Sequence, residues 1–331
     1  MEGNAMNLRS LLGFYGIFFG LTFSALGAAL PGAPTVLVVV GAPGEPEFGT
    51  NFLQQAALWM QTAERGGATV VGFGLQPESA TNDLEQLKSH IHSEPLDGPG
   101  ELWLVLIGHG TFDGKEARFN LRGPDVSAAE LAAWLKPLRR PLAVINTTAS
   151  SAPFLNALSG TNRVVITATR SGSEQNVTRL GLPLAVALGD PSADLDHDGQ
   201  TSLLEAFLAG SRGAMEFYQT ASRLATEHAL LDDNGDGLGT PADWFRGVRA
   251  TKQARDGASL DGATARRFTL IQSPAEQALD PAVRARRDGL ERAVESLRAR
   301  KAAMPADDYY RALETLLLDL AQVYGAAEVN R

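Results

Sequence analysis

Short runs of consecutive apolar residues alternate along much of the chain with segments in which apolar residues recur at helical spacing. The runs are rich in β-branched and aliphatic residues, as strands buried on both faces of a sheet are. They are Thr35–Val40, Ala68–Phe73, Leu102–Ile107, Leu142–Ile145 and Val164–Thr167. The segments with helical spacing are Asn51–Ala63, Asp83–Ile91, Ser127–Leu135 and Leu182–Leu188. This alternation predicts an α/β fold, a mostly parallel sheet flanked by helices.

Polar turns follow two of the predicted strands. Gly108, His109 and Gly110 come directly after the third run, and Asn146 to Thr148 come after the fourth. In parallel sheets, functional residues collect in the loops after the carboxyl ends of the strands. These two turns are therefore the place where we expect chemistry in the sheet.

The chain changes character after Asp280. Pro281–Ala303 has the pattern of a basic amphipathic helix, Asp307–Tyr324 that of an acidic one, and Met304 to Ala306 form a turn between them. Opposite charge and similar length predict an antiparallel helical hairpin. We expect this C-terminal hairpin, residues 271–331, to serve in packing or oligomerisation and not in chemistry.

The N-terminus has the pattern of a targeting segment. Arg9 precedes the apolar stretch Leu11–Leu30, which ends in small residues before Pro31. We expect residues 1–29 to be a cleaved signal peptide and the protein to be exported, to the periplasm or the extracellular space. The alternative is an uncleaved membrane anchor, because the stretch is close to the ~20 residues that span a bilayer. Its several glycines make it a weak span.

Charge and cysteine content exclude some classes of function. The chain has 29 Lys and Arg against 38 Asp and Glu, a net charge of -9, and no basic block interleaved with aromatic residues. We therefore expect no nucleic-acid partner. The chain has no cysteine, which excludes disulfides, thiolate zinc sites and a cysteine nucleophile. Its 331 residues, 44% of them hydrophobic, can supply a substantial core.

A calcium-binding frame of EF-hand type runs from Asp194 to Glu205. Such a frame supplies oxygen ligands from positions 1, 3, 5, 7, 9 and 12 around a glycine at position 6. Gly199 is that glycine, and Ser202 stands at position 9. Position 7 contributes its backbone carbonyl, and position 12 closes the shell with both oxygens of a carboxylate. The expected ligands are Asp194, Asp196, Asp198, Gln200 and Glu205.

A second frame of the same type runs from Asp232 to Asp243, with Gly237 at position 6. Asp243 is shorter than a Glu at position 12, and Pro241 constrains the exit, so we expect weaker calcium binding or more tolerance for magnesium. One Asp-Gly-rich stretch is usually an ordinary turn, but two complete frames favour Ca²⁺ as a cofactor bound by residues 193–270. The expected ligands are Asp232, Asn234, Asp236, Leu238 through its carbonyl, and Asp243.

Four stretches together resemble the caspase-fold cysteine peptidases, nearest to the legumain-type branch, over roughly residues 35–210. The stretches are LWLVLIGHGTFDG, RGPDVSAAEL, PLAVINTTASSAPFLNALSG and RVVITATRSGSEQN. In that fold a histidine followed by glycine ends one strand, and a turn of the form Asp-Ser/Thr-Cys-x-Ser/Ala ends the next. The resemblance implies a caspase-like α/β domain over residues 30–192.

The resemblance also implies roles for the two polar turns. It implies His109 as the catalytic base and Gly110 in the turn that forms the oxyanion site. It places Thr148 where the family has its cysteine, and Asn146 where an aspartate is common. A threonine hydroxyl is a much weaker acid than a thiol, so we expect peptidase activity to be impaired. Without the neighbouring motifs, His109 would be a hydrogen-bonded histidine in a glycine turn.

Within the last of these four stretches, Thr169 to Glu174 resembles the segment that lines the specificity pocket of the family. The resemblance implies that Arg170 and Glu174 contact an acidic or amide side chain of a substrate. The alternative is that both are surface charges or ion-pair partners.

Two functions follow from these observations. One is an exported calcium-binding homologue of the caspase and legumain-type peptidases that acts as a binding or scaffold module for a peptide or protein. The other is a calcium-dependent peptidase or transpeptidase in which His109 activates Thr148, or else Ser150 or Ser151, as a hydroxyl nucleophile. Because calcium is plentiful outside the cytoplasm, weak calcium sites would suffice to stabilise the fold.

Overall fold

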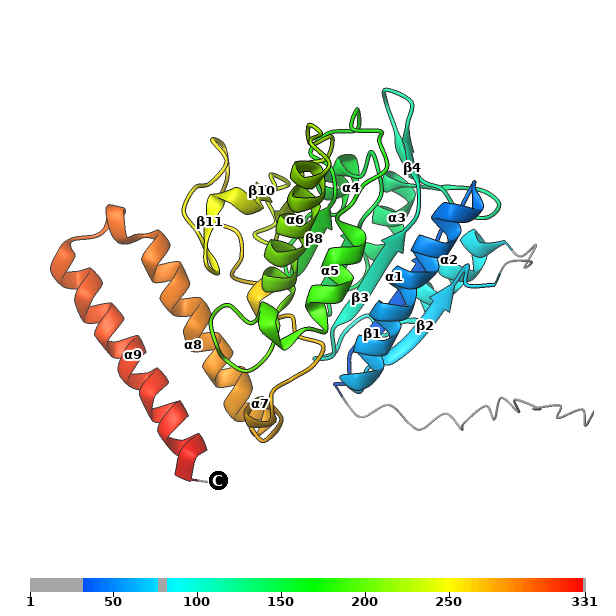
Figure 1. The fold of residues 1–331 in the computed structure, drawn as a ribbon. Helices are drawn as coiled ribbons and strands as arrows, with labels where there is room; N and C mark the ends of the chain where they lie inside the picture. Colours follow the sequence, from blue (N-terminus) through cyan, green and yellow to red (C-terminus); the bar gives the residue numbers. More distant parts are fainter. Residues whose placement is uncertain (1–31, 77–81, 330–331) are drawn as a thin grey trace, which may run out of the picture.

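The structure is a computed structural model that describes residues 32–76 and 82–329 (Figure 1). The expected signal peptide, residues 1–29, lies outside the described residues. Among the helices of the described part, none combines the length and the apolar character needed to cross a membrane.

A seven-stranded sheet lies at the centre, in the order β10-β9-β8-β7-β3-β1-β2. The five strands from β2 to β8 in this order run parallel, which confirms the predicted mostly parallel sheet. Two short antiparallel strands, β9 and β10, extend it beyond β8; the apolar pattern does not predict them. The strands are β1 Thr35–Val40, β2 Thr69–Phe73, β3 Leu102–Ile107, β7 Leu142–Asn146, β8 Arg163–Thr167, β9 Leu230–Asp232 and β10 Thr240–Pro241.

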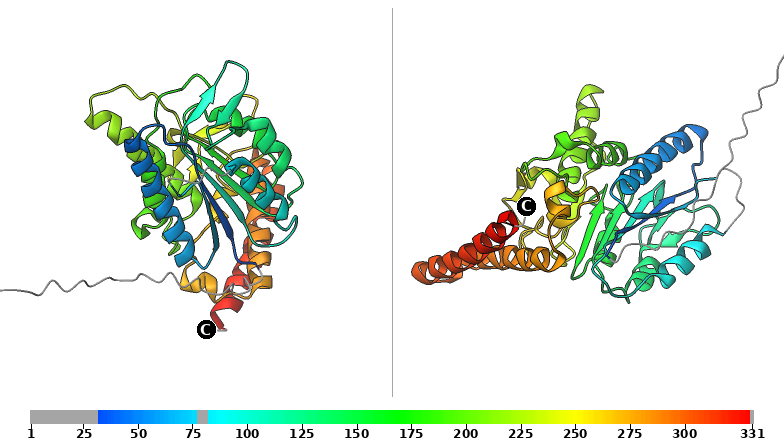
Figure 2. Two further views of the ribbon diagram at one scale, coloured as in Figure 1. Left: turned by 90° about the vertical axis from the view of Figure 1, so that its right-hand side faces the viewer. Right: turned by 90° about the horizontal axis from the view of Figure 1, so that it is seen from below.

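Helices cover both faces of this sheet (Figure 2). Side chains of α1, α5 and α6 form one core with the sheet, and side chains of α2, α3 and α4 form the other. In β1, Val38 faces the first core and Val39 the second, which is why the strand is apolar throughout. The helices are α1 Pro46–Arg65, α2 Asp83–Ser93, α3 Ala128–Leu135, α4 Ala152–Leu158, α5 Gly181–Leu188 and α6 Leu203–Thr220.

A small three-stranded antiparallel sheet connects β3 to α3. Its strands are β4 Gly110–Phe112, β5 Ala117–Phe119 and β6 Val126–Ser127. Because β4 begins one residue after His109, this histidine is held between two strands. Ser127 then starts α3 with a capping box: its hydroxyl accepts from the Glu130 N–H, and the Glu130 carboxylate accepts from the Ser127 N–H.

The chain from Pro191 onward lies on the β9–β10 side of the sheet and ends in the predicted hairpin. α8 and α9 lie side by side in opposite directions (Figures 1 and 2). α8 ends at Ala299, earlier than expected, because the chain continues as the short turn η4. The elements are η1 Pro191–Ala193, η2 Ala242–Trp244, β11 Phe245–Arg246, β12 Arg249–Ala250, η3 Ala265–Arg267, α7 Pro274–Gln277, α8 Pro281–Ala299, η4 Lys301–Ala303 and α9 Ala306–Val329.

Candidate functional site

A pocket of about 460 Å³ opens beside His109 at the carboxyl ends of β3 and β7. The pocket is lined by the N-terminal turns of α1, by both polar turns and by the segment before α5. This is the edge of the parallel sheet at which functional residues were expected. Residues that line it include Phe48, Asn51, Gln55, His109, Thr147, Gln175 and Arg179.

The His109 ring is fixed on the α1 side of the pocket. The ring centroids of Phe48 and Phe52 lie 5.0 and 5.1 Å from that of His109, both edge-on. Nε2 of His109 lies 3.1 Å from the carbonyl oxygen of Pro43. Because a carbonyl oxygen can only accept a hydrogen bond, Nε2 is the donor in this contact.

Thr148 is completely buried, although its neighbours Thr147 and Ala149 line the pocket. Its hydroxyl donates to Oδ1 of Asn146 at 2.7 Å, with the Ala149 carbonyl oxygen as a second acceptor at 3.1 Å. Among the hydrogen bonds of the described residues, none joins Thr148 to His109. The Thr148 hydroxyl is thus directed to acceptors other than the histidine.

Gly110 lies directly against the Thr148 side chain. A Cβ atom at Gly110 would lie 2.6 Å from Oγ1 of Thr148 and 2.2 Å from the Ala149 carbonyl oxygen. Both contacts are closer than real Cβ atoms allow, so this position has room for glycine only. The fold therefore places Gly110 against Thr148.

The two alternative hydroxyls are also buried. Ser151 Oγ accepts from the N–H groups of Ala168 and Thr169 at 3.1 and 3.2 Å. Ser150 has a φ of 54°, in the left-handed region, and its Oγ has no hydrogen-bond partner among the described residues. Neither hydroxyl forms a hydrogen bond with His109.

Arg170 and Glu174 pair with each other and do not line the pocket. Nε of Arg170 lies 3.3 Å from the Glu174 carboxylate, which also lies 2.6 Å from Nδ1 of His228. The Glu174 backbone carbonyl accepts from the Ser150 N–H at 2.8 Å. Glu174 thus holds the loop after β8 in place, and Gln175 is its neighbour that reaches the pocket.

The first loop, residues 194–205, curls around its own carboxylates. Asp194 at position 1 accepts from the N–H groups of Asp198 and Gly199 at 3.2 and 2.9 Å. Oxygens of Asp194, Asp196 and Asp198 lie within 4.8 Å of one another. Gly199 has a φ of 86°, which the turn requires. Oδ1 of Asp196 is buried and lacks a hydrogen-bond partner in the described part of the chain.

Glu205 closes the first loop from inside α6. It is 1% exposed. One oxygen accepts from the N–H groups of positions 2 and 3, Leu195 and Asp196, at 2.7 and 3.2 Å. The other accepts from the N–H and the hydroxyl of position 9, Ser202, at 2.8 and 2.7 Å. The carboxylate therefore ties the start of the loop to its end.

The second loop, residues 232–243, joins β9 to β10 and repeats this geometry. Asp232 at position 1 accepts from the N–H groups of Gly235 and Gly237, both at 3.0 Å. Asp236 at position 5 accepts from the Leu238 N–H at 2.8 Å, as Asp198 accepts from position 7 of the first loop. Asn234 at position 3 accepts from the Asp236 N–H at 2.9 Å.

The carboxylate that corresponds to Glu205 in the second loop belongs to Asp261. One of its oxygens accepts from the N–H groups of positions 2 and 3, Asp233 and Asn234, at 3.0 and 3.3 Å. The other accepts from the hydroxyl of position 9, Thr240, at 2.6 Å. Asp243 is exposed, and its carboxylate makes no hydrogen bond or ion pair with any described residue.

The difference between Asp243 and Glu205 comes from where the helical turn begins. In the first loop Ser202 at position 9 is the N-cap of α6, so position 12 is the third helical residue and can reach back to the cap. In the second loop Pro241 at position 10 is the N-cap of η2. Asp243 is then the second helical residue and does not reach back. The twelve-residue frame does not predict a role for Asp261, because this residue lies 28 positions after Asp233 and outside the frame.

The segment that follows Asp261 connects both loops. Asp233 accepts from the N–H groups of Gly262, Thr264 and Ala265 at 2.7 to 2.8 Å. Five residues after Asp261, Nε of Arg266 lies 3.1 Å from the Asp196 carboxylate of the first loop. The two loops and residues 261–266 therefore form one continuous polar cluster at the sheet edge.

Negative charge is concentrated in this cluster. Burial raises the pKa of Asp198, and the Asp196 and Glu205 carboxylates raise it further. Burial raises the pKa of Asp261 to about 8, with the Asp233 carboxylate adding to the rise, and burial also raises the pKa of Asp233. A divalent cation would relieve this crowding, and the carboxylate, amide and carbonyl oxygens present are the ligands that calcium prefers.

We expect the calcium-free protein to lose stability as pH rises from about 4 to about 8. In this range folded Asp261 retains a proton that the unfolded chain releases, which contributes at most ~1.4 kcal/mol per pH unit to the fall in the free energy of unfolding. Urea denaturation in a chelator at several pH values measures the slope. Asp261→Asn should reduce the slope by this contribution, while Glu101, whose pKa burial also raises to about 8, keeps its own; an unchanged slope in the variant would contradict the assignment.

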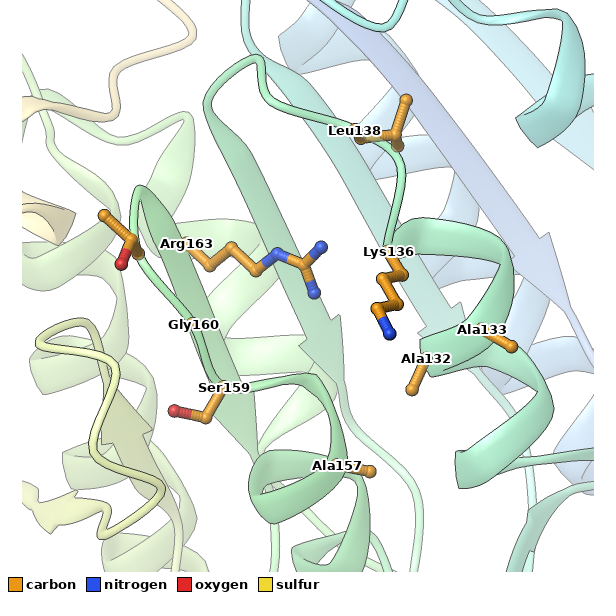
Figure 3. A pocket seen from close by; sticks show the side chains of 9 residues that line it. Ala132, Ala133, Lys136, Leu138, Ala157, Ser159, Gly160 and Arg163 are labelled. Atoms are coloured by element: carbon orange, nitrogen blue, oxygen red, sulfur yellow. The ribbon is translucent and has the colours of Figure 1, made fainter.

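A second hollow, of about 440 Å³, lies between α3 and α4 (Figure 3). The side chains of Lys136 and Arg163 point into it. The Arg163 guanidinium donates to the carbonyl oxygens of Leu135 and Leu158, at 2.7 and 3.2 Å. These carbonyls end α3 and α4, so Arg163 neutralises two helix C-termini and has a structural role.

Comparison with known proteins gives only distant structural similarity. No protein-family model matches the chain. No curated protein matches it. Among solved structures it is similar to the Drosophila initiator caspase Dronc, with 14% identity and a TM-score of 0.42, over 70% of this chain and 91% of that one. It is also similar to a protein from Geobacter sulfurreducens, with 12% identity and a TM-score of 0.40, over 72% of this chain and 100% of that one.

Proposed function

We propose that the chain is an exported, calcium-stabilised protein with a caspase-like fold that binds a peptide or protein without cleaving it. Support for the caspase-like assignment comes from the sheet. His109 and Thr148 stand at the carboxyl ends of the adjacent parallel strands β3 and β7, where the resembling peptidases carry their histidine and cysteine.

The calcium part of the proposal rests on the equivalence of the two loops. In the first loop calcium would be held by Asp194, Asp196 and Asp198, by the Gln200 carbonyl and by Glu205. The bound ion supplies positive charge that offsets the clustered carboxylates and fixes the connection between α5 and α6.

In the second loop we propose that Asp261 takes the closing position in place of Asp243. The other ligands would be Asp232, Asn234, Asp236 and the Leu238 carbonyl. The observation that carries this assignment is the shared pattern at Glu205 and Asp261, since each carboxylate accepts from positions 2, 3 and 9 of its loop.

The absence of cleavage follows from the state of Thr148. Its hydroxyl is buried and donates to Asn146, and a hydroxyl nucleophile needs a base within hydrogen-bond reach. His109 is bonded instead to the Pro43 carbonyl. Among the described residues, the Thr148 hydroxyl has only the Asn146 side chain and the Ala149 carbonyl as hydrogen-bond partners, and neither is a base, which supports binding without cleavage.

The binding part of the proposal rests on the lining of the pocket. Gln55 donates to Asn51 Oδ1 at 2.6 Å and Gln175 to the Phe112 carbonyl at 3.2 Å, while Oε1 of Gln55 has no hydrogen-bond partner among the described residues and is an acceptor for a peptide N–H. Phe48 and Phe52, which contact the His109 ring, offer apolar contact. A short stretch of extended peptide is the ligand that this chemistry fits.

A mixed peptide library and a fluorophosphonate probe test the proposal in the presence of calcium. We expect peptides to be captured, with no cleavage and no labelling of the protein. His109→Ala should weaken capture at least about tenfold, while Leu53→Ala, on the same helix as Phe52 but outside the pocket, should not. Cleavage or labelling that disappears in Thr148→Ala would instead establish the peptidase with a hydroxyl nucleophile.

A further inference from the structure

The outer face of α9 carries a row of exposed apolar side chains. Tyr310, Leu317 and Tyr324 are 58%, 46% and 45% exposed, and Leu318 beside them is 59% exposed. The first three are seven residues apart, which places them on one line along a helix. Single exposed apolar residues are ordinary, but an aligned row on one helix marks an interaction surface.

The adjoining face of α9, about 100° around the helix from the row, is already used within the chain. Tyr309 and Val323 are buried on the side that packs along α8, which separates α9 from the sheet (Figures 1 and 2). Tyr324 reaches across the edge of this contact, where its hydroxyl donates to Glu291 at 3.0 Å. Lys301 also lies over the Tyr310 ring, 5.7 Å from its centroid, so both tyrosines of the row touch the hairpin at one edge, whereas Tyr309 and Val323 supply its buried contacts.

We propose that the outer face of α9 pairs in antiparallel fashion with α9 of a second copy of this chain. The proposal is independent of calcium and of the pocket beside His109. Its first support is charge. A parallel pair would place Glu314 against Glu314 and Arg311 against Arg311 of the second copy, and like charges directly opposed are destabilising.

An antiparallel pair centred between Leu317 and Leu318 removes this conflict. Leu317 then faces Leu318 of the second copy, and Glu314 faces Ala321 of the second copy. Tyr310 faces Gly325 of the second copy, where no atom lies within 4 Å of the place a Cβ would occupy. The small residue leaves a hollow opposite the largest exposed side chain, as knobs-into-holes packing requires.

The exposed area of the four apolar side chains sets the size of the dimer interface. The exposed fractions of the four apolar residues add up to about two fully exposed residues. Their exposed area is therefore on the order of 400 Å² per copy. Homodimer interfaces are about 65% apolar, so the whole contact would bury roughly 1,200 Å², the lower limit for a stable dimer. We expect a reversible dimer whose population depends on protein concentration.

Sedimentation velocity of the purified full chain over about 1–200 µM tests the pairing. We expect a monomer at the lowest concentration and a dimer at the highest. Leu318→Glu and Leu317→Lys should each weaken dimerisation at least about tenfold. Leu224→Glu changes a leucine that is 90% exposed outside α9 and should leave the dimer unchanged. A melting curve for each variant checks that it is folded.

Mixing the two variants tests the antiparallel register. The carboxylate introduced by Leu318→Glu in one copy would face the ammonium introduced by Leu317→Lys in the other. An equal mixture of the two variants should therefore recover a heterodimer. A mixture that stays monomeric would exclude this register. An unsubstituted chain that is monomeric throughout the series, or a dimer that only Leu224→Glu disrupts, would overturn the proposal.

Discussion

Replacing Asp261 by Asn is expected to reduce the number of calcium ions bound per chain from two to one. The Asn side chain is isosteric but carries no charge and offers one acceptor oxygen, so it cannot close a calcium shell with both oxygens. The remaining site, in the first loop, should keep its affinity because Glu205 is unchanged. Isothermal titration of the chelator-treated, dialysed protein measures the stoichiometry.

Asp243→Asn is the matched control for this experiment. The Asp243 carboxylate is exposed and makes no hydrogen bond or ion pair with described residues, so this variant should still bind two ions. Loss of a site in Asp243→Asn together with two sites in Asp261→Asn would restore the closing position of the sequence frame. Loss in neither variant would show that no carboxylate proposed here closes the second loop.

Replacing Glu205 by Gln is expected to have the largest effect on stability. The buried carboxylate accepts four hydrogen bonds, two on each oxygen. A Gln side chain turns one of these oxygens into a donor; with that NH2 group toward Ser202, the hydroxyl can accept and the Ser202 N–H is left unpaired, at about 1–3 kcal/mol. We expect the free energy of unfolding to fall by about 1–3 kcal/mol without calcium.

The difference should widen in calcium, because the variant also loses the binding energy of the first site. Urea denaturation with calcium and with chelator measures both effects. Glu216→Gln, an exposed position on the same helix, should change neither curve. A Glu205→Gln protein as stable as the unsubstituted chain in both conditions would show that the first loop needs neither this carboxylate nor its ion.

The parallel sheet could be predicted because each of its strands is buried on both faces and is therefore apolar without interruption. β3, which is buried at every position, is the clearest case. β9 and β10 were not predicted because they are only three and two residues long. In addition, Asp232 at the end of β9 belongs to the predicted calcium frame as well as to the sheet. Pairing with β8, not apolar pattern, decides their structure.

The site was predictable where its contacts are local. Position 1 of each loop accepts from the N–H of position 6, five residues on, and the glycines at position 6 have positive φ. Asp261 could not be predicted, because its partners lie more than twenty residues away. Pro241 is the one local signal, since it delays the helical turn and moves Asp243 out of reach. Likewise, residue spacing gives no sign that Glu174 faces His228 and not the pocket.

The number of calcium ions bound by the unsubstituted chain shows whether both loops are calcium sites. Titration of calcium into protein freed of metal by chelation and dialysis should give two ions per chain, and the melting temperature should rise as calcium is added. The second site should be the weaker, because its closing group is a shorter Asp. A titration that releases or absorbs no heat, together with an unchanged melting temperature at millimolar calcium, would show that neither loop binds calcium.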